Sequence, residues 1–240
     1  MTAERHRSSE RWLGILQPVF LPWLGYFEQM TRVDHFVFQE DVQYTRHDWR
    51  NRNRIKTAAG PAWLTVPVHS GGQHSLIKDI SVDYGRDWVG KHVRSIEQAY
   101  ARAPRVRNIT REYAEIVSRR PDALVDLTIP LVGWLARELG VRTTTSRASD
   151  VPRGDDVDLN GRILEIARFH GATHLYLGAK AAEYVPPSLY EPHGIEVVFQ
   201  DYPHPTYPQL HGDFLSHMSA LDLLINVPQS KLSSVLGWGG

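Results

Sequence analysis

The chain has 240 residues, of which 42% are hydrophobic, and its 27 basic residues balance its 27 acidic residues. This length is enough to bury a substantial core, and a net charge of zero gives no indication of the basic surface that binds duplex nucleic acid. The absence of cysteine excludes disulfides, thiolate metal sites and a cysteine nucleophile, and it favours a cytoplasmic protein.

The first residues resemble neither a signal peptide nor a membrane anchor. Residues 1–11 are charged and lack the apolar segment of a signal peptide, so we expect a flexible leader. No apolar run in the chain approaches the roughly 20 residues that a membrane-spanning helix needs. The sequence therefore predicts no membrane span.

The chain then begins with a predicted strand, helix and strand. Residues 13–16 are an apolar run that stops at Gln17-Pro18, residues 23–33 carry apolar side chains at helical spacing, and residues 36–38 form a second apolar run. Two strands connected by a helix form a βαβ unit, which favours parallel pairing.

The middle of the chain predicts a long polar loop, two strands and three helices. Residues 41–57 mix arginine, asparagine and aromatic side chains without a clear period, which is typical of a functional loop. The predicted strands, 63–66 and 77–82, are separated by a Gly71-Gly72 turn. The predicted helices are 89–103, 106–118 and 122–140, and Pro130 either kinks the third helix or begins a new one.

The last third returns to alternating helices and strands. A helix over residues 159–170 precedes predicted strands 173–177 and 195–199, and an apolar helical stripe follows from Phe214 to Ile225. We therefore expect one α/β domain over residues 12–228, with a Rossmann-like, mostly parallel sheet. A helical subdomain is expected as an insertion at about residues 86–140, and a mobile tail over residues 229–240.

Polar clusters follow three of the predicted strands, at Gln17, at residues 39–41 and at Gln200-Asp201. In open α/β sheets, ligands bind beyond the carboxyl ends of the strands. The sequence therefore predicts a site built by residues 17–27, 41–56 and 200–209. The alternative is that these clusters are ordinary polar strand ends.

The predicted site is rich in groups that bind sugars and anions. The amide of Gln17 both donates and accepts hydrogen bonds, and the helix that begins near Trp23 would attract an anionic group at its N-terminus. Arginine suits carboxylate or phosphate, and asparagine suits sugar hydroxyls. A proline-rich turn over a core and a salt-bridged surface loop are the structural alternatives. The further substrate-binding candidates are Gln43, Asn51, Arg52, Asn53, Arg54, Lys56, Gln200 and Tyr207.

His204 is the main candidate for proton transfer. It lies between Pro203 and Pro205, so its backbone is restricted and its ring could be held in a fixed position. Asp201 could orient the ring, and Asp41 is a third catalytic candidate. The alternative is a rigid loop that contains a structural histidine.

The remaining histidines are scattered, without the spacing of a zinc site. We therefore predict no structural metal, while a catalytic metal assembled from distant residues stays open. The sequence contains no dinucleotide-binding fingerprint, no phosphate-binding loop motif and no nucleophile-elbow motif.

Several segments together resemble one known protein family, the WbqC-like family, over about residues 13–226. The segments that carry this resemblance are residues 16–27 (LQPVFLPWLGYF), 41–44 (DVQY), Trp49, 51–56 (NRNRIK), 63–67 (WLTVP), Leu177-Gly178, 200–209 (QDYPHPTYPQ) and 222–224 (DLL). The family is associated with the synthesis of O-antigen and other polysaccharides and with natural-product pathways. The resemblance thus implies work on amino sugars or related metabolites. The chain departs from the commoner family pattern at residues 179–182 (AKAA) after Gly178, so its specificity is expected to differ if that turn cradles a substrate.

Our leading hypothesis is transfer of an acyl or aminoacyl group to an amine of an amino-sugar nucleotide or a related small metabolite. The donor would be carried by coenzyme A or a carrier protein. His204 would take the proton from the amine; Gln17, Asn51 and Asn53 would hold the substrate or oxyanion; and Arg52, Arg54 or Lys56 would bind a phosphate or carboxylate.

Two other function classes stay open. The βαβ opening resembles that of HUP-group nucleotidyltransferases and ligases, which would imply an ATP-dependent reaction, but the paired histidines of their phosphate site are absent. A non-catalytic binding protein of a polysaccharide assembly complex would use exposed aromatic anchors such as Trp12, Trp134 and Trp238. A homodimer is compatible with the neutral charge.

Overall fold

The computed structural model describes residues 9–69 and 75–238. The chain divides into two compact units. The first, the sheet unit, comprises the residues up to 16 together with 29–39 and 143–202. The second, the helical unit, comprises residues 17–28, 40–142 and those from 203 onward.

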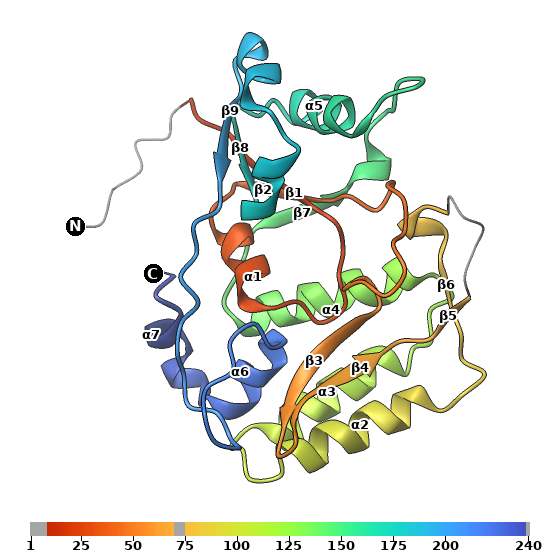
Figure 1. The fold of residues 1–240 in the computed structure, drawn as a ribbon, viewed down its shortest axis with the longest axis vertical. Helices are drawn as coiled ribbons and strands as arrows, with labels where there is room; N and C mark the ends of the chain where they lie inside the picture. The colour runs from red at the N-terminus through yellow and green to blue at the C-terminus, as the bar shows by residue number, and fades with distance from the viewer. Residues whose placement is uncertain (1–8, 70–74, 239–240) are drawn as a thin grey trace. The chain divides into compact units, whose positions relative to one another are not determined.

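The sheet unit is built on five parallel strands in the order β7-β2-β1-β8-β9 (Figure 1). This sheet confirms the prediction of a Rossmann-like α/β fold with parallel pairing. The sequence missed only β7, whose residues Thr-Thr-Ser-Arg lack an apolar pattern because the strand lies at the sheet edge. The strands are β1 (Trp12–Leu16), β2 (His35–Phe38), β7 (Thr144–Arg147), β8 (His174–Leu177) and β9 (Glu196–Phe199).

Helix α5 (Leu159–Phe169) covers one face of this sheet. Its buried Ile163 and Ile166 belong to the same apolar cluster as Leu13 and Leu175 of the central strands, as the spacing of its apolar residues predicts. Helix α1 (Leu24–Thr31) runs from the helical unit into the sheet unit.

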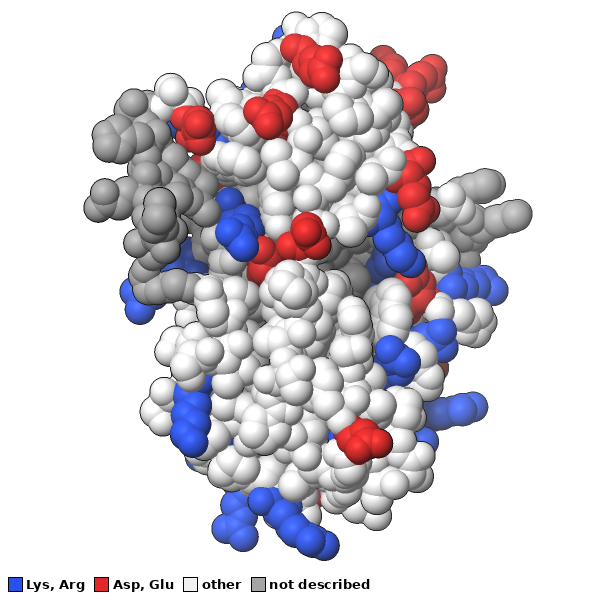
Figure 2. All heavy atoms as spheres, turned by 60° about the vertical axis from the view of Figure 1, so that its left-hand side comes forward, with Lys and Arg blue, Asp and Glu red and all other residues white. Residues whose placement is uncertain are grey.

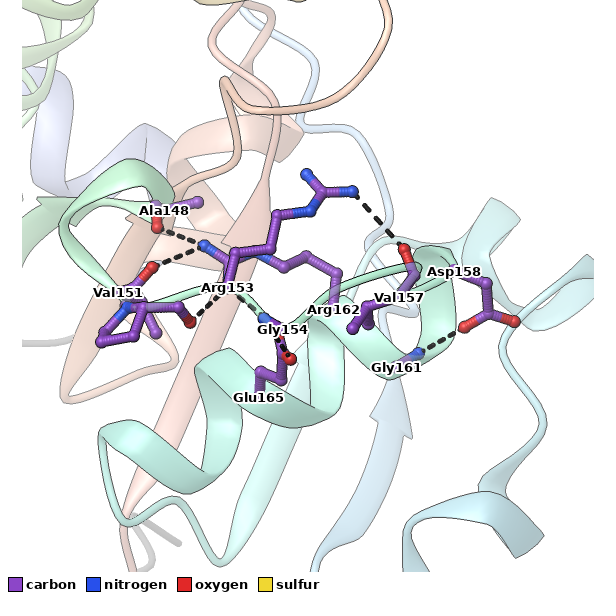
Figure 3. A network of polar contacts seen from close by, with 10 residues as sticks. Ala148, Val151, Arg153, Gly154, Val157, Asp158, Gly161, Arg162 and Glu165 are labelled. Carbon is purple, nitrogen blue, oxygen red and sulfur yellow. Dashed lines mark hydrogen bonds and ion pairs between the residues drawn. The ribbon is translucent and has the colours of Figure 1, made fainter.

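A buried arginine holds the loop between β7 and α5 in place (Figure 3). Arg162 is 1% exposed, and its guanidinium donates to the carbonyls of Ala148 at 2.6 Å, Val151 at 2.9 Å and Pro152 at 2.8 Å. It also pairs with Glu165 at 2.9 Å. Because both terminal nitrogens of the guanidinium are bonded to this loop and to Glu165 of α5, we assign Arg162 a structural role.

The helical unit combines an antiparallel hairpin with a group of helices. The hairpin consists of β3 (Arg52–Thr57) and β4 (Gly60–Thr65), and a two-residue pair joins β5 (Val68–His69) to β6 (Ser81–Val82). Three predicted helices are confirmed, and Pro130 lies inside the third without ending it. The helices are α2 (Trp88–Ala99), α3 (Val106–Val117), α4 (Leu124–Glu138), α6 (Ala220–Asn226) and α7 (Leu232–Leu236).

Three local predictions in this unit were wrong. Residues 52–57 form strand β3, because buried Asn53 and Ile55 alternate with more exposed arginines, a period of two that polar residues conceal. The predicted strand 77–82 begins as a 3-10 turn, Ile77–Asp79. The last helix begins only at Ala220, because His217 has a φ of +58°, which a right-handed helix excludes.

The predicted Gly71-Gly72 turn and most of the leader lie outside the described residues. In the segment expected to be a mobile tail, residues 229–231 form a 3-10 turn and α7 follows, with Leu232 and Leu236 buried. Within the described ranges, no helix combines the length and the apolar composition needed to cross a bilayer.

Candidate functional site

Two of the segments singled out by sequence, residues 17–27 and 41–56, lie together in the helical unit, where backbone hydrogen bonds also join them to residues 219–220. The amide of Phe20 donates to the carbonyl of Trp49 at 3.0 Å, and the amide of Ala220 donates to the carbonyl of Pro22 at 2.8 Å. The amide of Ser219 donates to the carbonyl of Arg54 at 3.0 Å. One structural cluster is therefore formed by residues 17–27, 41–56 and 219–220.

Asn53 is the centre of this cluster. It is 3% exposed, and its side-chain amide donates to the carbonyls of Phe20 at 3.1 Å and Leu21 at 2.8 Å, while its Oδ1 accepts from the amide of Arg54 at 2.8 Å. Leu21 has a φ of +46°, a backbone conformation that is unfavourable for a residue with a side chain. The proline that follows, Pro22, restricts the backbone of Leu21 further. The side chain of Asn53 therefore binds the backbone of a strained turn and stabilises it.

Two other amides of the predicted site keep an unused acceptor. Asn51 is buried and donates to the carbonyl of Val66 at 2.8 Å, but its Oδ1 has no hydrogen-bond partner among the described residues. The buried Oε1 of Gln17 is in the same situation. Buried acceptors without partners are costly, and they concentrate at binding sites. Asp41 is also buried in this unit, whereas Gln43 is exposed.

The ring of His204 is half-buried among aromatic side chains of the helical unit. Its centroid lies 6.1 Å from that of Trp23 with nearly parallel planes, 5.1 Å from His217, 5.8 Å from Phe214 and 6.3 Å from Tyr207. Four rings therefore hold the imidazole that the sequence singled out for proton transfer, including the candidates Trp23 and Tyr207.

The hydrogen bonds of His204 define its tautomer. Nδ1 lies 2.8 Å from the carbonyl oxygen of Pro205, which can only accept, so Nδ1 carries the proton. Nε2 accepts a 3.3 Å hydrogen bond from the amide of His217, a residue with a φ of +58°. Burial lowers the pKa of His204, the bond to Pro205 raises it, and the nearby His217 lowers it again. The ring is therefore a neutral imidazole at pH 7 with its basic nitrogen on the His217 side.

A buried carboxylate anchors the loop that carries these rings. Asp222 is fully buried and accepts from Tyr100 at 2.7 Å and from Gln209 at 2.8 Å. Gln209 also exchanges two hydrogen bonds with the backbone of Leu215. Burial raises the pKa of Asp222, and hydrogen bonds from Tyr100, Tyr207 and Gln209 together with the charge of Lys56 oppose that rise.

Lys56 extends this network along strand β3. Its amide donates to the hydroxyl of Tyr100 at 3.0 Å, and its ammonium donates to the carbonyls of Gly212 at 3.3 Å and Asp213 at 2.5 Å. Lys56 is 2% exposed, so its charge stabilises the loop next to Phe214. The sequence predicted Lys56 to be a phosphate or carboxylate ligand, and it indicated Asp222 only among the residues of the family resemblance. The acidic side chain of Asp222 within the apolar stripe of α6 is the pattern that could have indicated a buried network.

Within the described part of the chain, the remaining site predictions do not contact the His204 ring. The guanidinium groups of Arg52 and Arg54, on either side of Asn53, lie over the ring of Trp63, and that of Arg54 also lies over Trp49. Gln200 and Asp201 belong to the sheet unit, after β9, where the amide of Gln200 donates to the carbonyl of Leu177 at 2.8 Å and Asp201 is exposed. The orienting partner that the structure gives to Nδ1 of His204 is the Pro205 carbonyl.

The sheet unit also contains a cavity of about 300 Å³ that no sequence motif indicated. The rings of His35 and His170 lie there with centroids 4.6 Å apart and planes tilted by 31°, and burial lowers the pKa of both rings. Among the described residues, no group of three histidine or carboxylate side chains is arranged to hold a metal ion. The residues that line the cavity are Arg11, Trp12, Leu13, Asp34, His35, His170 and Ala172.

Comparisons with known proteins agree on one family. The model of the WbqC-like protein family matches residues 17–234. An uncharacterized protein of Mycobacterium tuberculosis, Rv1507c, is 35% identical over 218 residues, which cover 90% of this chain and 93% of that relative. No solved structure matches the chain. The matched segment includes the asparagine-held turn, the His204 cluster and the Asp222 network, and the chain belongs to the WbqC-like protein family.

Proposed function

We propose that this protein transfers an acyl or aminoacyl group to the amine of an amino-sugar nucleotide or a related small metabolite, with His204 as the general base. One observation carries the proposal: the half-buried imidazole of His204 is neutral, and its proton is fixed on Nδ1 by the carbonyl of Pro205. A general base needs an unprotonated nitrogen on a ring that is held in place.

In the proposed reaction, the amine nitrogen attacks the carbonyl carbon of a thioester carried by coenzyme A or a carrier protein. Nε2 of His204 takes a proton from the attacking nitrogen, so the new C–N bond forms without a charged product. When the C–S bond breaks, the imidazolium returns the proton to the thiolate leaving group. The amine of the acceptor would displace the long hydrogen bond from the His217 amide, which at 3.3 Å is weak.

Other residues of the cluster would bind and position the substrates. The side chain of Gln17 and the unpaired Oδ1 of Asn51 are proposed to contact the substrate, while Asn53 acts as a positioning residue because its amide is already used. Asp41, Gln43, Gln200 and Asp201 remain predictions from the sequence.

The test is a product assay on the whole protein. Amino-sugar nucleotides and simple amines are combined with acyl and aminoacyl thioesters, and new amides are detected by mass spectrometry together with release of free thiol. The proposal expects an amide product and one thiol for each amide formed. Release of pyrophosphate from ATP would favour nucleotide transfer instead, and saturable binding without turnover under every donor would favour a non-catalytic binding protein.

A further inference from the structure

Arg52, Arg54 and Trp63 of the β3–β4 hairpin (orange in Figure 1) form an exposed surface together with Trp49, which precedes the hairpin in the chain; this surface is here named the Trp–Arg platform. Trp49 is 39% exposed and Trp63 is 45% exposed, and their ring centroids lie 5.3 Å apart. The guanidinium carbon of Arg52 lies 4.3 Å from the Trp63 ring centroid. That of Arg54 lies 5.4 Å from Trp49 and 5.6 Å from Trp63.

The sequence of the hairpin produces this arrangement directly. Arg54 and Trp63 are paired across the antiparallel strands, so their side chains emerge on the same face, and Arg52 lies two residues earlier on that face. The carbonyl of Trp49 accepts the Phe20 amide, which fixes the second ring beside the hairpin. Two large apolar rings that stay exposed in this way are unusual without a binding role.

The charges of the platform are not neutralised by the protein. Within residues 9–69 and 75–238, the guanidinium of Arg54 makes no hydrogen bond or ion pair, and that of Arg52 donates to the carbonyl of His47, which carries no charge. The nearby carboxylate of Asp48 is already paired with Arg50 at 2.8 Å. The platform therefore offers flat apolar rings together with cationic groups that lack an anion.

We propose that the Trp–Arg platform binds the nucleoside diphosphate part of the acceptor, with the base stacked on Trp63 and Trp49 and the phosphates on Arg54 and Arg52. Indole rings stack on any nucleobase, and planar guanidinium groups bind phosphate oxygens in pairs. This inference rests on the proposed function only where it identifies the nucleotide as part of the acceptor. Binding of the nucleotide to the platform can be measured without any transfer reaction.

The platform also adjoins the His204 cluster. Lys56 follows Arg54 by two residues on β3, so the alternation of the strand places it on the same side. Its ammonium contacts the carbonyls of residues 212 and 213, directly before Phe214, whose ring packs on His204. A substrate held by its nucleotide on the platform would therefore extend along β3 toward the histidine.

A single nucleotide fits the platform better than a polymer does. Proteins that bind single-stranded nucleic acid use a continuous basic groove along the backbone. The platform itself offers two guanidinium groups, and on the one face drawn in Figure 2 the Lys and Arg side chains are scattered among uncharged and acidic side chains.

Titration calorimetry of the full chain with UDP tests the proposal. The comparison ligands are uridine, inorganic pyrophosphate and a 15-nucleotide poly(U). UDP is expected to bind, with uridine and pyrophosphate each at least about 10-fold weaker, because each provides only one of the two contacts. Trp63→Ala and Arg54→Ala are expected to weaken UDP binding by about 5- to 100-fold, the range of one base stack or one charged contact.

Conservative variants and a matched control complete the test. Trp63→Phe should recover part of the affinity, and Arg54→Lys should recover less, since the ammonium is not planar. Phe169→Ala, which removes a 58% exposed ring of the sheet unit, should bind UDP as the unaltered protein does. Equal binding of UDP and pyrophosphate, unchanged binding by a correctly folded Trp63→Ala protein, or binding of poly(U) alone would each overturn the proposal.

This experiment separates the two proposals. His204→Ala should bind UDP normally even where turnover is lost. If UDP binds as described but no thioester yields an amide, the transfer reaction is wrong and the platform stands. If amides form only on amines without a nucleotide and UDP does not bind, the platform is wrong and the transfer reaction stands.

Discussion

Replacement of His204 by alanine is expected to reduce kcat/KM for amide formation by about 100- to 10,000-fold, the usual contribution of a positioned general base. The aromatic cluster and the Asp222 network remain, so substrate binding should change much less than kcat. The matched control is His193→Ala, an exposed histidine of the sheet unit, which should keep full activity. Full turnover in a correctly folded His204→Ala protein would remove the general-base assignment.

The pH dependence of the same reaction follows from the pKa of His204. Burial lowers this pKa below its ordinary value of 6.5, so the neutral, active form predominates at pH 7 and persists into mildly acidic solution. The acid limb of kcat/KM is therefore expected below pH 6.5, and His204→Ala should lose that limb. An acid limb above pH 6.5 would contradict the assignment.

Replacement of Asp222 by alanine is expected to lower the free energy of unfolding by about 3 to 5 kcal/mol. The change leaves the hydroxyl of Tyr100 and the amide of Gln209 buried without their acceptor, and it also removes the countercharge of Lys56. Urea denaturation measures the loss, and Asp79→Ala, an exposed acid of the same unit, should change stability by less than about 0.5 kcal/mol.

The isosteric variant Asp222→Asn separates the charge from the packing. Asparagine preserves the volume and one acceptor oxygen but turns an N–H group toward a donor, so we expect a smaller loss of about 1 to 3 kcal/mol. If Asp222→Ala were as stable as Asp79→Ala, the network would not hold the loop that carries Phe214 and His204.

The sequence predicted those parts of the fold in which apolar residues recur with a clear period. The parallel strands β1, β2, β8 and β9 and the helices α2 to α5 carry such patterns, because one face of each packs on a core. Strand β7 could not be found in this way, since its Thr-Thr-Ser-Arg sequence is held by pairing with β2 at the sheet edge. Pairing between distant strands leaves no local signal.

For the candidate site, the sequence indicated which polar residues would be involved, but it did not indicate what each of them binds. The polar segments around Gln17 and Asn53 lie together in the helical unit, whereas the sequence argument placed the site at the ends of parallel strands, and Asn53 holds the backbone of a strained turn. An asparagine that binds substrate and one that binds a carbonyl look identical in a sequence. The rings around His204 come from residues 23, 207, 214 and 217, a proximity that only tertiary packing creates.

The protonation of His204 is the most direct test of the proposed mechanism. Nitrogen-15 NMR of the full chain, with the His204 signals assigned by comparison with His204→Ala, reports which ring nitrogen carries the proton and at which pH the ring titrates. We predict a proton on Nδ1 at pH 7 and a pKa below 6.5. A proton on Nε2 would contradict the account, because the nitrogen that faces His217 could then not act as the base, and a pKa above 6.5 would contradict the effect of burial on this ring.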